Sequence, residues 1–325
     1  MKKPFLSIII TTYNEQKYIH ACLESIYKNN FKNIEVLIVD DASTDKTIKI
    51  IKKFPVKLFI LKKNKGAAFA KNFAIKKAKS NFIFFIDADA TLQKNILSKM
   101  IKIIKKHKNL SGINGIWSDT PINKGYFPKY QSVDMNFAMK SMAKKKYSFH
   151  WGNGSLIKKK ILLDLGGFNE KFKGAGAEDY ELALRIPENK KFLVKENLIS
   201  MQHNFPYFFF SGVKKYISRS KRHIEVLLNF KTNDKFHTTK KNFLILILSN
   251  LIIFSSIINY DKNIFFFGFF LTIYLFLNLK KLIFIKQRNN IIFLFYFFFM
   301  SLIVNFLISV GSAIGCLSYF LKKIK

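Results

Sequence analysis

Two pairs of neighbouring carboxylates stand out in a chain that is otherwise rich in lysine. Asp87 and Asp89 are two residues apart at the end of an apolar run, so their carboxylates can reach the same side of an extended segment. Hard divalent cations prefer such oxygen ligands and keep other coordination positions open for phosphate. A solvated acidic turn is the alternative, but the chain has 55 Lys and Arg against 20 Asp and Glu. The first pair therefore predicts a metal site.

The second pair, Glu178-Asp179, follows a glycine-rich stretch that contains Gly174 and Gly176. Glycine permits backbone conformations that can bring such a pair over a binding site. Acidic residues at this point would also complement the dipole of a helix that starts here. Both readings are open from the residues alone.

The elements that must position these carboxylates alternate between strand and helix. Four apolar runs predict buried strands, over Phe5–Thr11, Ile34–Val39, Val56–Leu61 and Phe82–Ile86. The segments between them predict helices from Asn14 to about Lys28, over Thr47–Phe54 and over Gly66–Lys79, with Asn14 and either Ser43 or Thr44 as caps. This alternation predicts a doubly wound, mostly parallel sheet, which binds ligands at the carboxyl ends of its strands. Thr11, Asp41 and Asp87 fall at such ends.

Six motifs follow one another in the first two thirds of the chain. They are Ser7-Ile-Ile-Ile-Thr-Thr-Tyr-Asn-Glu15, Val39-Asp-Asp-Ala-Ser-Thr-Asp45, Asn64-Lys-Gly-Ala-Ala-Phe-Ala-Lys-Asn72, Phe85-Ile-Asp-Ala-Asp89, Gly166-Gly-Phe-Asn-Glu170 and Glu178-Asp-Tyr-Glu-Leu182. Each motif is weak alone. The ordered set, over about residues 5–205, resembles the family 2 glycosyltransferases of the GT-A fold. The expected fold class is therefore α/β, with a Rossmann-like GT-A domain followed by C-terminal transmembrane helices.

The resemblance implies a nucleotide-sugar donor, with a UDP-sugar as the expectation. It implies that Asp89 binds Mg²⁺ or Mn²⁺ at the donor diphosphate, that Asp87 lies nearer the ribose, and that His203 is a further metal ligand. A structural role is the alternative for His203. The remaining donor contacts that it implies are Thr11, Tyr13, Glu15, Asp41, Gly66 and Lys71.

Among these donor residues, Asp41 is expected to accept from the uracil imide, while Asp40 is the more structural neighbour. Packing is the alternative for Thr11 and Tyr13. Lys71 stands where the family often has Arg, so a bidentate contact becomes a point charge.

The resemblance also assigns the chemistry at the acceptor. It implies that Asp179 is the general base that deprotonates the acceptor hydroxyl, with inversion at the anomeric carbon, and that Glu178 assists. Trp151 and Asn153 are candidate acceptor contacts, by stacking and by hydrogen bonding. For the tryptophan, core packing is the alternative.

The last third of the chain carries three uncharged apolar runs, Phe243–Tyr260, Ile264–Leu279 and Ile291–Leu321. Their lengths predict two or three membrane spans, although the 16 residues of the second run are few for one. Buried core helices are the alternative. We expect a GT-A domain over residues 1–205, interfacial amphipathic helices over residues 206–241, and a transmembrane region over residues 242–325.

The formal net charge of +35 does not indicate a nucleic-acid partner. Nearly all of the excess is lysine, and no RNP-type, zinc-finger or helix-turn-helix pattern accompanies it. Anionic lipid headgroups explain a basic surface better. Lys240-Lys241 and a basic loop over Lys280–Arg288 favour the cytosol, so we expect a multi-pass protein of the inner membrane with a cytoplasmic catalytic domain. A third span would place Lys322 and Lys323 outside, unless the last run bends or re-enters.

The function predicted is transfer of a sugar from a nucleotide sugar to a hydroxyl of a lipid-linked or cell-envelope glycan. The alternative is a polyprenyl-phosphate glycosyltransferase. A catalytically inactive membrane-binding module is less favoured, because Asp41, Asp89 and Asp179 are intact. A processive synthase is set aside, because neither Trp117 nor Trp151 stands in a Gln-x-x-Arg-Trp context.

Overall fold

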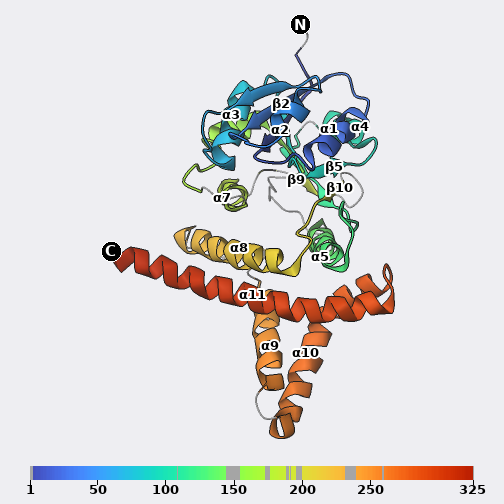
Figure 1. Ribbon diagram of the computed structural model, residues 1–325, viewed down its shortest axis with the longest axis vertical. Coiled ribbons are helices and arrows are strands. Elements are labelled where there is room, and N and C mark those ends of the chain that lie inside the picture. The colour runs from blue at the N-terminus through green and yellow to red at the C-terminus, as the bar shows by residue number, and fades with distance from the viewer. Residues whose placement is uncertain are drawn as a thin grey trace. The chain divides into compact units, whose positions relative to one another are not determined.

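The computed structural model describes residues 3–107, 109–143, 154–172, 176–187, 190, 192–194, 200–230, 239–257 and 260–324 (Figure 1). The chain divides into two compact units. Unit 1 consists of Met1–Asn123 and Asp134–Phe205, and unit 2 consists of Lys124–Val133 and Pro206–Lys325. The three-part division expected from the sequence stays a prediction.

The main sheet of unit 1 has seven strands in the order β3-β2-β1-β4-β8-β6-β9. The first four strands of this order are mutually parallel, whereas β8 runs antiparallel to both β4 and β6. The strands are β1 (Leu6–Thr12), β2 (Ile34–Asp40), β3 (Lys57–Ile60), β4 (Phe82–Phe85), β6 (Gly112–Asn114), β8 (Ser155–Lys158) and β9 (Phe192–Val194). The prediction of a mostly parallel α/β sheet is confirmed.

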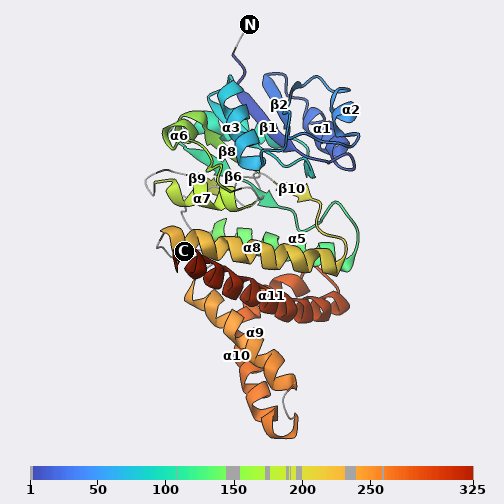
Figure 2. The same ribbon diagram turned by 60° about the vertical axis from the view of Figure 1, so that its left-hand side comes forward.

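Helices pack against this sheet because each presents an apolar face to it. Around α3, small and branched side chains of the helix meet the central strands, as in the contacts of Ala70 and Ala74 with Ile9 and Leu37 in one buried cluster. The helices are α1 (Ile19–Tyr27), α2 (Thr47–Ile51), α3 (Ala67–Lys77), α4 (Ile96–Lys106), α6 (Lys159–Asp164) and α7 (Ala177–Arg185), and α5 (Tyr126–Ala143) contributes residues to both units. Figure 2 shows these elements from a second side.

A small second sheet begins directly after Asp87 and Asp89, the acidic pair that follows β4. Its order is β5-β10-β7, formed by β5 (Ala90–Leu92), β10 (Ser200–His203) and β7 (Ile116–Trp117). Strand β10 runs antiparallel to β5, and this register sets His203 opposite Ala90. This pairing brings His203 beside the acidic pair that follows β4.

The predicted helix caps are wrong. Asn14 does not start α1, which begins at Ile19, because Asn14 has a positive φ of 57° and its side-chain oxygen accepts from the backbone N–H of Thr44. Asp45, instead of Ser43 or Thr44, accepts from the backbone N–H at the start of α2. Ser43 donates to Asp40 through both its N–H and its hydroxyl. These loops are bound to each other across about 30 residues, which a local capping rule cannot anticipate.

Unit 2 is helical, with α8 (Phe209–Phe230), α9 (Lys240–Ile257), α10 (Tyr260–Lys286) and α11 (Ile291–Ile324). Three of these helices, at Lys240–Ile257, Ile264–Lys286 and Ile291–Lys323, are long and apolar enough to cross a membrane. The second run is longer than its 16 uncharged residues suggested, and the predicted basic loop is helical up to Lys286. The third run is one helix of 34 residues.

Candidate active site

The acidic pair that follows β4 meets a histidine from β10. His203 Nε2 lies 3.2 Å from Asp89 Oδ1 and 3.8 Å from Asp87 Oδ2. One ligand atom from each of the three residues lies within 4.8 Å of the other two. The structure therefore brings together the predicted metal ligands Asp89 and His203 and adds Asp87 to them.

Backbone pairing and aromatic packing hold this group in place. The amide of Asn204 donates to the carbonyl of Asp89 at 2.9 Å, which extends the β5–β10 ladder into the acidic turn. The His203 ring packs edge-on against Trp117, with ring centroids 4.5 Å apart, and against Phe205 at 4.9 Å. Trp117 lies beside His203 because β7 pairs with β10, although the two strands are far apart in the sequence. No local pattern around Trp117 indicates this contact.

The three residues fit Mg²⁺ or Mn²⁺. Neighbouring ligands of an octahedral Mg²⁺ are roughly 3 Å apart, because each lies about 2.1 Å from the ion. The His203–Asp89 separation of 3.2 Å already has this value. Asp87 and Asp89 have side chains 42% and 23% exposed, which leaves open positions for water or phosphate oxygens. His203 Nδ1 is buried and has no hydrogen-bond partner within the described residues, so Nε2 is the atom offered to an ion.

The electrostatics of this group favour a bound cation. Burial alone would lower the pKa of His203, but the carboxylates of Asp89 and Asp87 outweigh burial and raise it. Burial, helped by the charges of Asp89 and Asp87, raises the pKa of Glu15 to about 7. Glu15 therefore faces the same acidic group. Both shifts report the negative charge of Asp87 and Asp89, which a divalent cation would offset.

Asp41 organises the loop before α3. Its two carboxylate oxygens accept from the backbone N–H groups of Lys65 and Gly66, at 2.7 and 2.8 Å. Gly66 has a positive φ of 90°, which glycine adopts without the penalty of a Cβ. Each oxygen keeps a second lone pair, so Asp41 can still accept from a ligand. Its expected contact with a base stays a prediction.

The buried ammonium group of Lys71 forms ion pairs with both Glu178 and Asp179. Lys71 Nζ on α3 lies 2.6 Å from Asp179 Oδ1 and 3.1 Å from Glu178 Oε1, both in the first turn of α7. Burial raises the pKa of Asp179 to about 7 against the attraction of Lys71, and the Glu178 carboxylate adds to the increase. The charge of Asp87 also acts on Asp179 and on Lys71. The base candidate and the metal group therefore share one electrostatic environment.

Lys71 was expected to contact the donor, and here it holds the carboxylate pair instead. Its ammonium also lies 5.0 Å from the centroid of the Phe168 ring. Neither contact is visible in the sequence, because Lys71 and Asp179 are 108 positions apart. The donor contact itself stays a prediction.

Two residues that the sequence analysis did not single out position α7. Asn72 accepts from the N–H of Phe168 and donates to the carbonyl of Phe168, both at 2.8 Å. Arg185 pairs with Glu181 and donates to the carbonyls of Leu165 and Gly167. The loop that carries the Gly166–Glu170 motif is thus fastened to both α3 and α7. Asn72 ends one of the quoted motifs, which is the signal that could have marked it.

The predicted donor contacts Tyr13 and Thr11 differ in how far they are exposed to solvent. Tyr13 is 47% exposed at the end of β1, which leaves its ring available to a ligand. Thr11 is half-buried on β1 itself. Trp151 and Asn153, the predicted acceptor contacts, lie outside the described residues.

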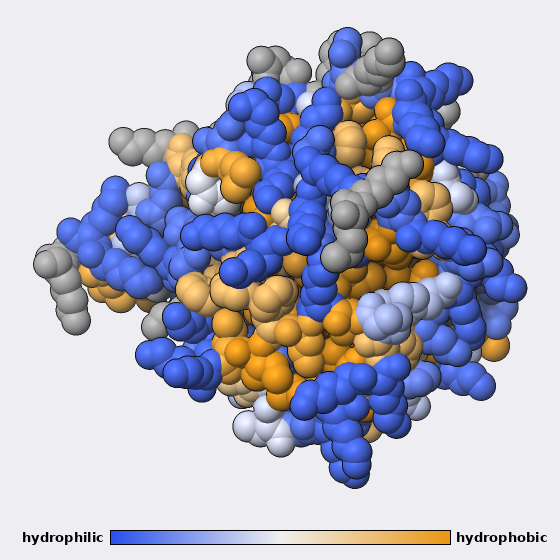
Figure 3. All heavy atoms as spheres, turned by 90° about the horizontal axis from the view of Figure 1, so that it is seen from above, coloured by the Kyte–Doolittle hydropathy of each residue, from blue (hydrophilic) through white to orange (hydrophobic). Residues whose placement is uncertain are grey.

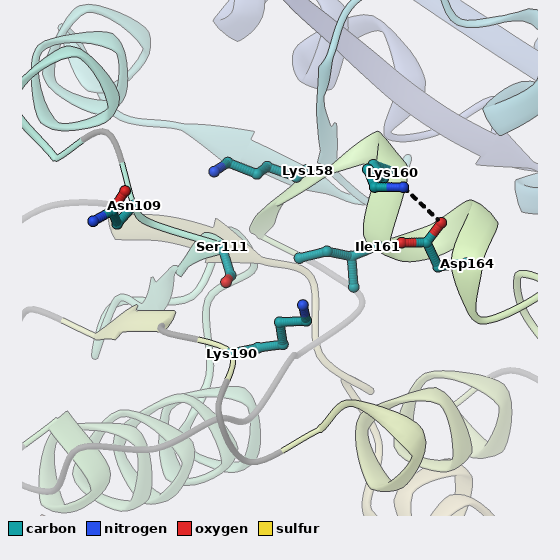
Figure 4. Close-up of a pocket in the computed structure, with 7 residues that line it drawn as sticks. All are labelled: Asn109, Ser111, Lys158, Lys160, Ile161, Asp164 and Lys190. Carbon is teal, nitrogen blue, oxygen red and sulfur yellow. Dashed lines mark hydrogen bonds and ion pairs between the residues drawn. The ribbon is translucent and has the colours of Figure 1, made fainter.

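A separate pocket of about 340 Å³ shares no residue with this site (Figure 4). It is lined by Asn109, Ser111, Lys158, Lys160, Ile161, Asp164 and Lys190. Figure 3 shows one face of the molecule, on which hydrophilic residues surround a hydrophobic area. The Lys160 ammonium pairs with Asp164 across one turn of α6.

Comparison with known proteins relates the sequence to sugar transfer. Residues 7–166 match the family model described as Glycosyl transferase family 2. The chain is 37% identical over 143 residues to the Escherichia coli protein WfaP, named UDP-Glc:alpha-D-GlcNAc-diphosphoundecaprenol beta-1,3-glucosyltransferase, covering 39% of this chain and 57% of WfaP. It is 35% identical over 122 residues to the poly(ribitol-phosphate) beta-N-acetylglucosaminyltransferase TarS of Staphylococcus aureus, covering 34% of this chain and 21% of TarS. Each match thus spans less than two thirds of the relative's length.

Solved structures share the fold. The crystal structure of S. aureus TarS 1–349 in complex with UDP-GlcNAc superposes with a TM-score of 0.52 at 22% identity, covering 69% of this chain and 67% of that one. The mannosyltransferase PcManGT of Pyrobaculum calidifontis, in complex with GDP-Man and Mn²⁺, superposes with a TM-score of 0.63 at 17% identity. That superposition covers 96% of this chain and 88% of the other. At these identities the likeness establishes the GT-A-like fold.

Proposed function

We propose that this chain, whose residues 7–166 match the family model of Glycosyl transferase family 2, is a metal-dependent, inverting glycosyltransferase. It takes a sugar from a nucleotide sugar, a UDP-sugar in our proposal, and transfers it to a hydroxyl of a lipid-linked or cell-envelope glycan. The observation that carries the proposal is the shared environment of the Asp87, Asp89 and His203 group and the buried Asp179.

On the donor side, Asp89, Asp87 and His203 would hold Mg²⁺ or Mn²⁺, which when bound supplies positive charge to the diphosphate. Asp41 keeps the lone pairs that a uracil imide would use, and Tyr13 keeps an exposed ring. The names of WfaP and of the TarS complex both specify UDP-sugars. This agreement supports UDP over the GDP carried by the archaeal structure.

On the acceptor side, a hydroxyl must lose its proton as it attacks the anomeric carbon. Asp179 has a pKa of about 7, so it is half ionised at neutral pH and still basic enough to accept a proton. A phosphate acceptor is already ionised and needs no base. The carboxylate at position 179 therefore favours a hydroxyl acceptor over a polyprenyl phosphate, with Glu178 and Lys71 positioning that carboxylate.

The deciding experiment compares Asp179→Asn with the wild-type chain in detergent. UDP-glucose and UDP-GlcNAc are supplied with either GlcNAc-diphosphoundecaprenol or undecaprenyl phosphate. We expect transfer to the sugar hydroxyl to fall by about 10²- to 10⁴-fold in Asp179→Asn, while binding of the donor, measured by calorimetry, is unchanged. Asp164→Asn, at an exposed carboxylate on α6, is the control and should keep full activity.

Product analysis separates the alternatives. If the product is a sugar phosphodiester of undecaprenyl phosphate, and Asp179→Asn forms it as fast as the wild type, the hydroxyl acceptor is wrong and the polyprenyl-phosphate reaction replaces it. Location is also part of the proposal: unit 1 acts in the cytoplasm at the inner membrane, anchored by unit 2. A periplasmic reporter that is active after residue 236 would contradict this orientation.

A further inference from the structure

The last helix of unit 2 is apolar enough to cross a membrane but has neighbours that cannot enter one. α11 has 34 residues, so it is about 50 Å long, against the roughly 30 Å of a hydrocarbon core. By composition alone it would be a third span. Its packing against α8 gives a different answer.

α8 runs beside the C-terminal part of α11 (Figure 1). Near the start of α11, Phe293 and Phe297 lie in one apolar cluster with Phe209 and Tyr216 of α8. Further along, the two helices come into backbone contact. The contact continues to the end of α11, where Tyr319 donates to the carbonyl of Leu228.

Two glycines of α11 permit this approach. A Cβ placed on Gly311 would lie 2.5 Å from the carbonyl oxygen of Ile217, and one on Gly315 would lie 2.6 Å from that of Lys221. Contacts therefore advance together along both chains, from Gly311 beside Ile217 to Tyr319 beside Leu228. The helices are parallel neighbours, so one cannot cross a membrane while the other lies along its surface.

α8 is too polar to cross a bilayer. Five of its 22 residues are Lys or Arg. They lie in the central part of the helix, at positions 214, 215, 219, 221 and 222. Each such charge is strongly unfavourable at the centre of a bilayer. A helix with this pattern lies along the membrane surface, its cations among the headgroups. Because α11 follows α8, α11 must also run along the membrane.

We propose that α11 does not span the membrane, and that α8 and α11 together form a surface layer in one leaflet. The acyl chains of that leaflet cover the exposed apolar side chains of α11, and anionic phospholipid headgroups meet the cations of α8. Only the α9–α10 hairpin crosses. The C-terminus therefore lies on the same side of the membrane as residues 206–240.

The hairpin has the length that this arrangement requires. α10 has 21 residues from its start at Tyr260 to Lys280, which is about 30 Å of helix. Lys240 and Lys241 begin α9 at the same end of the hairpin as Lys280, so the cations stand at one membrane surface. The hairpin leaves α11 at a steep angle in both views of the ribbon (Figures 1 and 2).

Polar contacts fix α11 to the hairpin part-way down α9. Asn305 donates to the hydroxyl of Ser249, and Asn250 donates to the hydroxyl of Ser309, both at 2.9 Å. These positions are about nine residues into α9, which is roughly 13 Å below its lysines. α11 thus lies one helix layer deeper than α8, within the hydrocarbon. This depth explains why α11 is nearly free of charge until Lys322 and Lys323.

The side of α11 that faces neither α8 nor the hairpin is apolar. Its exposed residues are large hydrophobic side chains, between 39% and 65% exposed: Ile292, Phe295, Phe299, Ile303, Leu317 and Phe320. Acyl chains are the partner that such a face requires when its helix lies in a leaflet. The cations of α8, together with Lys322 and Lys323 at the end of α11, favour the anionic, cytoplasmic leaflet.

Topology reporters test the proposal in the full chain. Alkaline phosphatase, active only outside the cytoplasm, and green fluorescent protein, fluorescent only inside, are fused after residues 236, 262 and 325. We expect the same reporter to be active after residues 236 and 325, and the opposite one after residue 262. If residues 236 and 325 report opposite sides, α11 crosses the membrane and the proposal is wrong. The result is independent of catalysis.

Disulfide trapping checks the packing without a fusion protein. In a background that carries Cys316→Ser, Ser220→Cys is combined with Gly311→Cys. A Cβ on residue 311 would lie 2.9 Å from that of Ser220, close to the roughly 3.8 Å of a disulfide, so oxidation in native membranes should link α8 to α11. The control pair, Ser220→Cys with Gly268→Cys, should not link, because nothing lies within 4 Å of a Cβ at Gly268. Equal linking of both pairs, or of neither, would contradict the proposal.

Discussion

Replacing Lys71 by methionine should move the pH dependence of the reaction. The Lys71 ammonium lies 2.6 Å from Asp179 Oδ1, and it opposes the burial that raises the pKa of Asp179 to about 7. Methionine has a similar length and no charge. In Lys71→Met the carboxylate keeps its burial and loses its counter-ion, so its pKa must rise further.

The size of this rise follows from the contact. Two unit charges about 4 Å apart attract by roughly 4 kcal/mol at an effective dielectric constant of 20, and each pKa unit corresponds to about 1.36 kcal/mol. Asp179 is 21% exposed, so solvent screening reduces the shift. We expect an increase of about one to two units, within the range known for such pairs. At pH 7 the ionised fraction of Asp179 then falls from about one half to roughly 1–10%.

The assay is kcat/KM for sugar transfer, measured from pH 6 to pH 10 with saturating metal. Because the base must be ionised, activity rises with pH through its pKa. Lys71→Met should lose about 5- to 50-fold at pH 7 and recover most of this at pH 9 to 10. Lys71→Arg keeps the charge and should keep the wild-type profile. If Lys71→Met raises KM for the donor at every pH and leaves the profile in place, Lys71 acts on the donor and the reasoning is wrong.

Two further changes test the metal group and the loop that positions α7. Asp89→Asn removes one of the three candidate metal ligands, so turnover with Mn²⁺ should be lost. Because Asp89 is partly exposed, the thermal unfolding midpoint in detergent should change little. Full activity of this variant, or of the wild type in EDTA, would exclude the metal role. Gly167→Ala should destabilise the fold by about 2 to 4 kcal/mol, because a Cβ would lie within contact distance of Asn72 Oδ1 at a positive φ. Gly166→Ala, also at a positive φ but with nothing within 4 Å, should cost only about 1 to 2 kcal/mol in the same unfolding assay, and equal losses would remove Asn72 from the explanation.

The first half of the main sheet was predictable because its signals are local. Apolar runs such as Ile34–Val39 are long enough to mark buried strands, and the intervening helices have regular periodicity. The side chains at the ends of these strands then gather at one edge, which follows from parallel pairing alone. The strand positions agree with the structure to within about one residue for this reason.

The rest depends on contacts between distant residues. The pairing of β4 with β8, the pairing of His203 with Ala90, and the contact of Lys71 with Asp179 join segments 72 to 113 positions apart. No periodic pattern encodes such pairs. The cap at Asn14 failed for the same reason, since its side chain bonds to Thr44 across the neighbouring strand.

Different surroundings explain how one small site can give different roles to carboxylates of similar intrinsic acidity. Asp87 and Asp89 are partly exposed and lie beside the ring nitrogen of His203, an arrangement that suits binding of a cation. Asp179 lies in a buried first turn, beside Glu178 and under Lys71, where burial costs the ionised form more than Lys71 returns. A carboxylate with a raised pKa can take a proton near neutral pH, which the exposed pair cannot do while it holds a metal. Asp89 and Asp179 are similarly exposed, at 23% and 21%, so the difference lies in their partners. His203 beside Asp89 and Lys71 beside Asp179 support the proposed metal role for the turn after β4 and the proposed base role for α7.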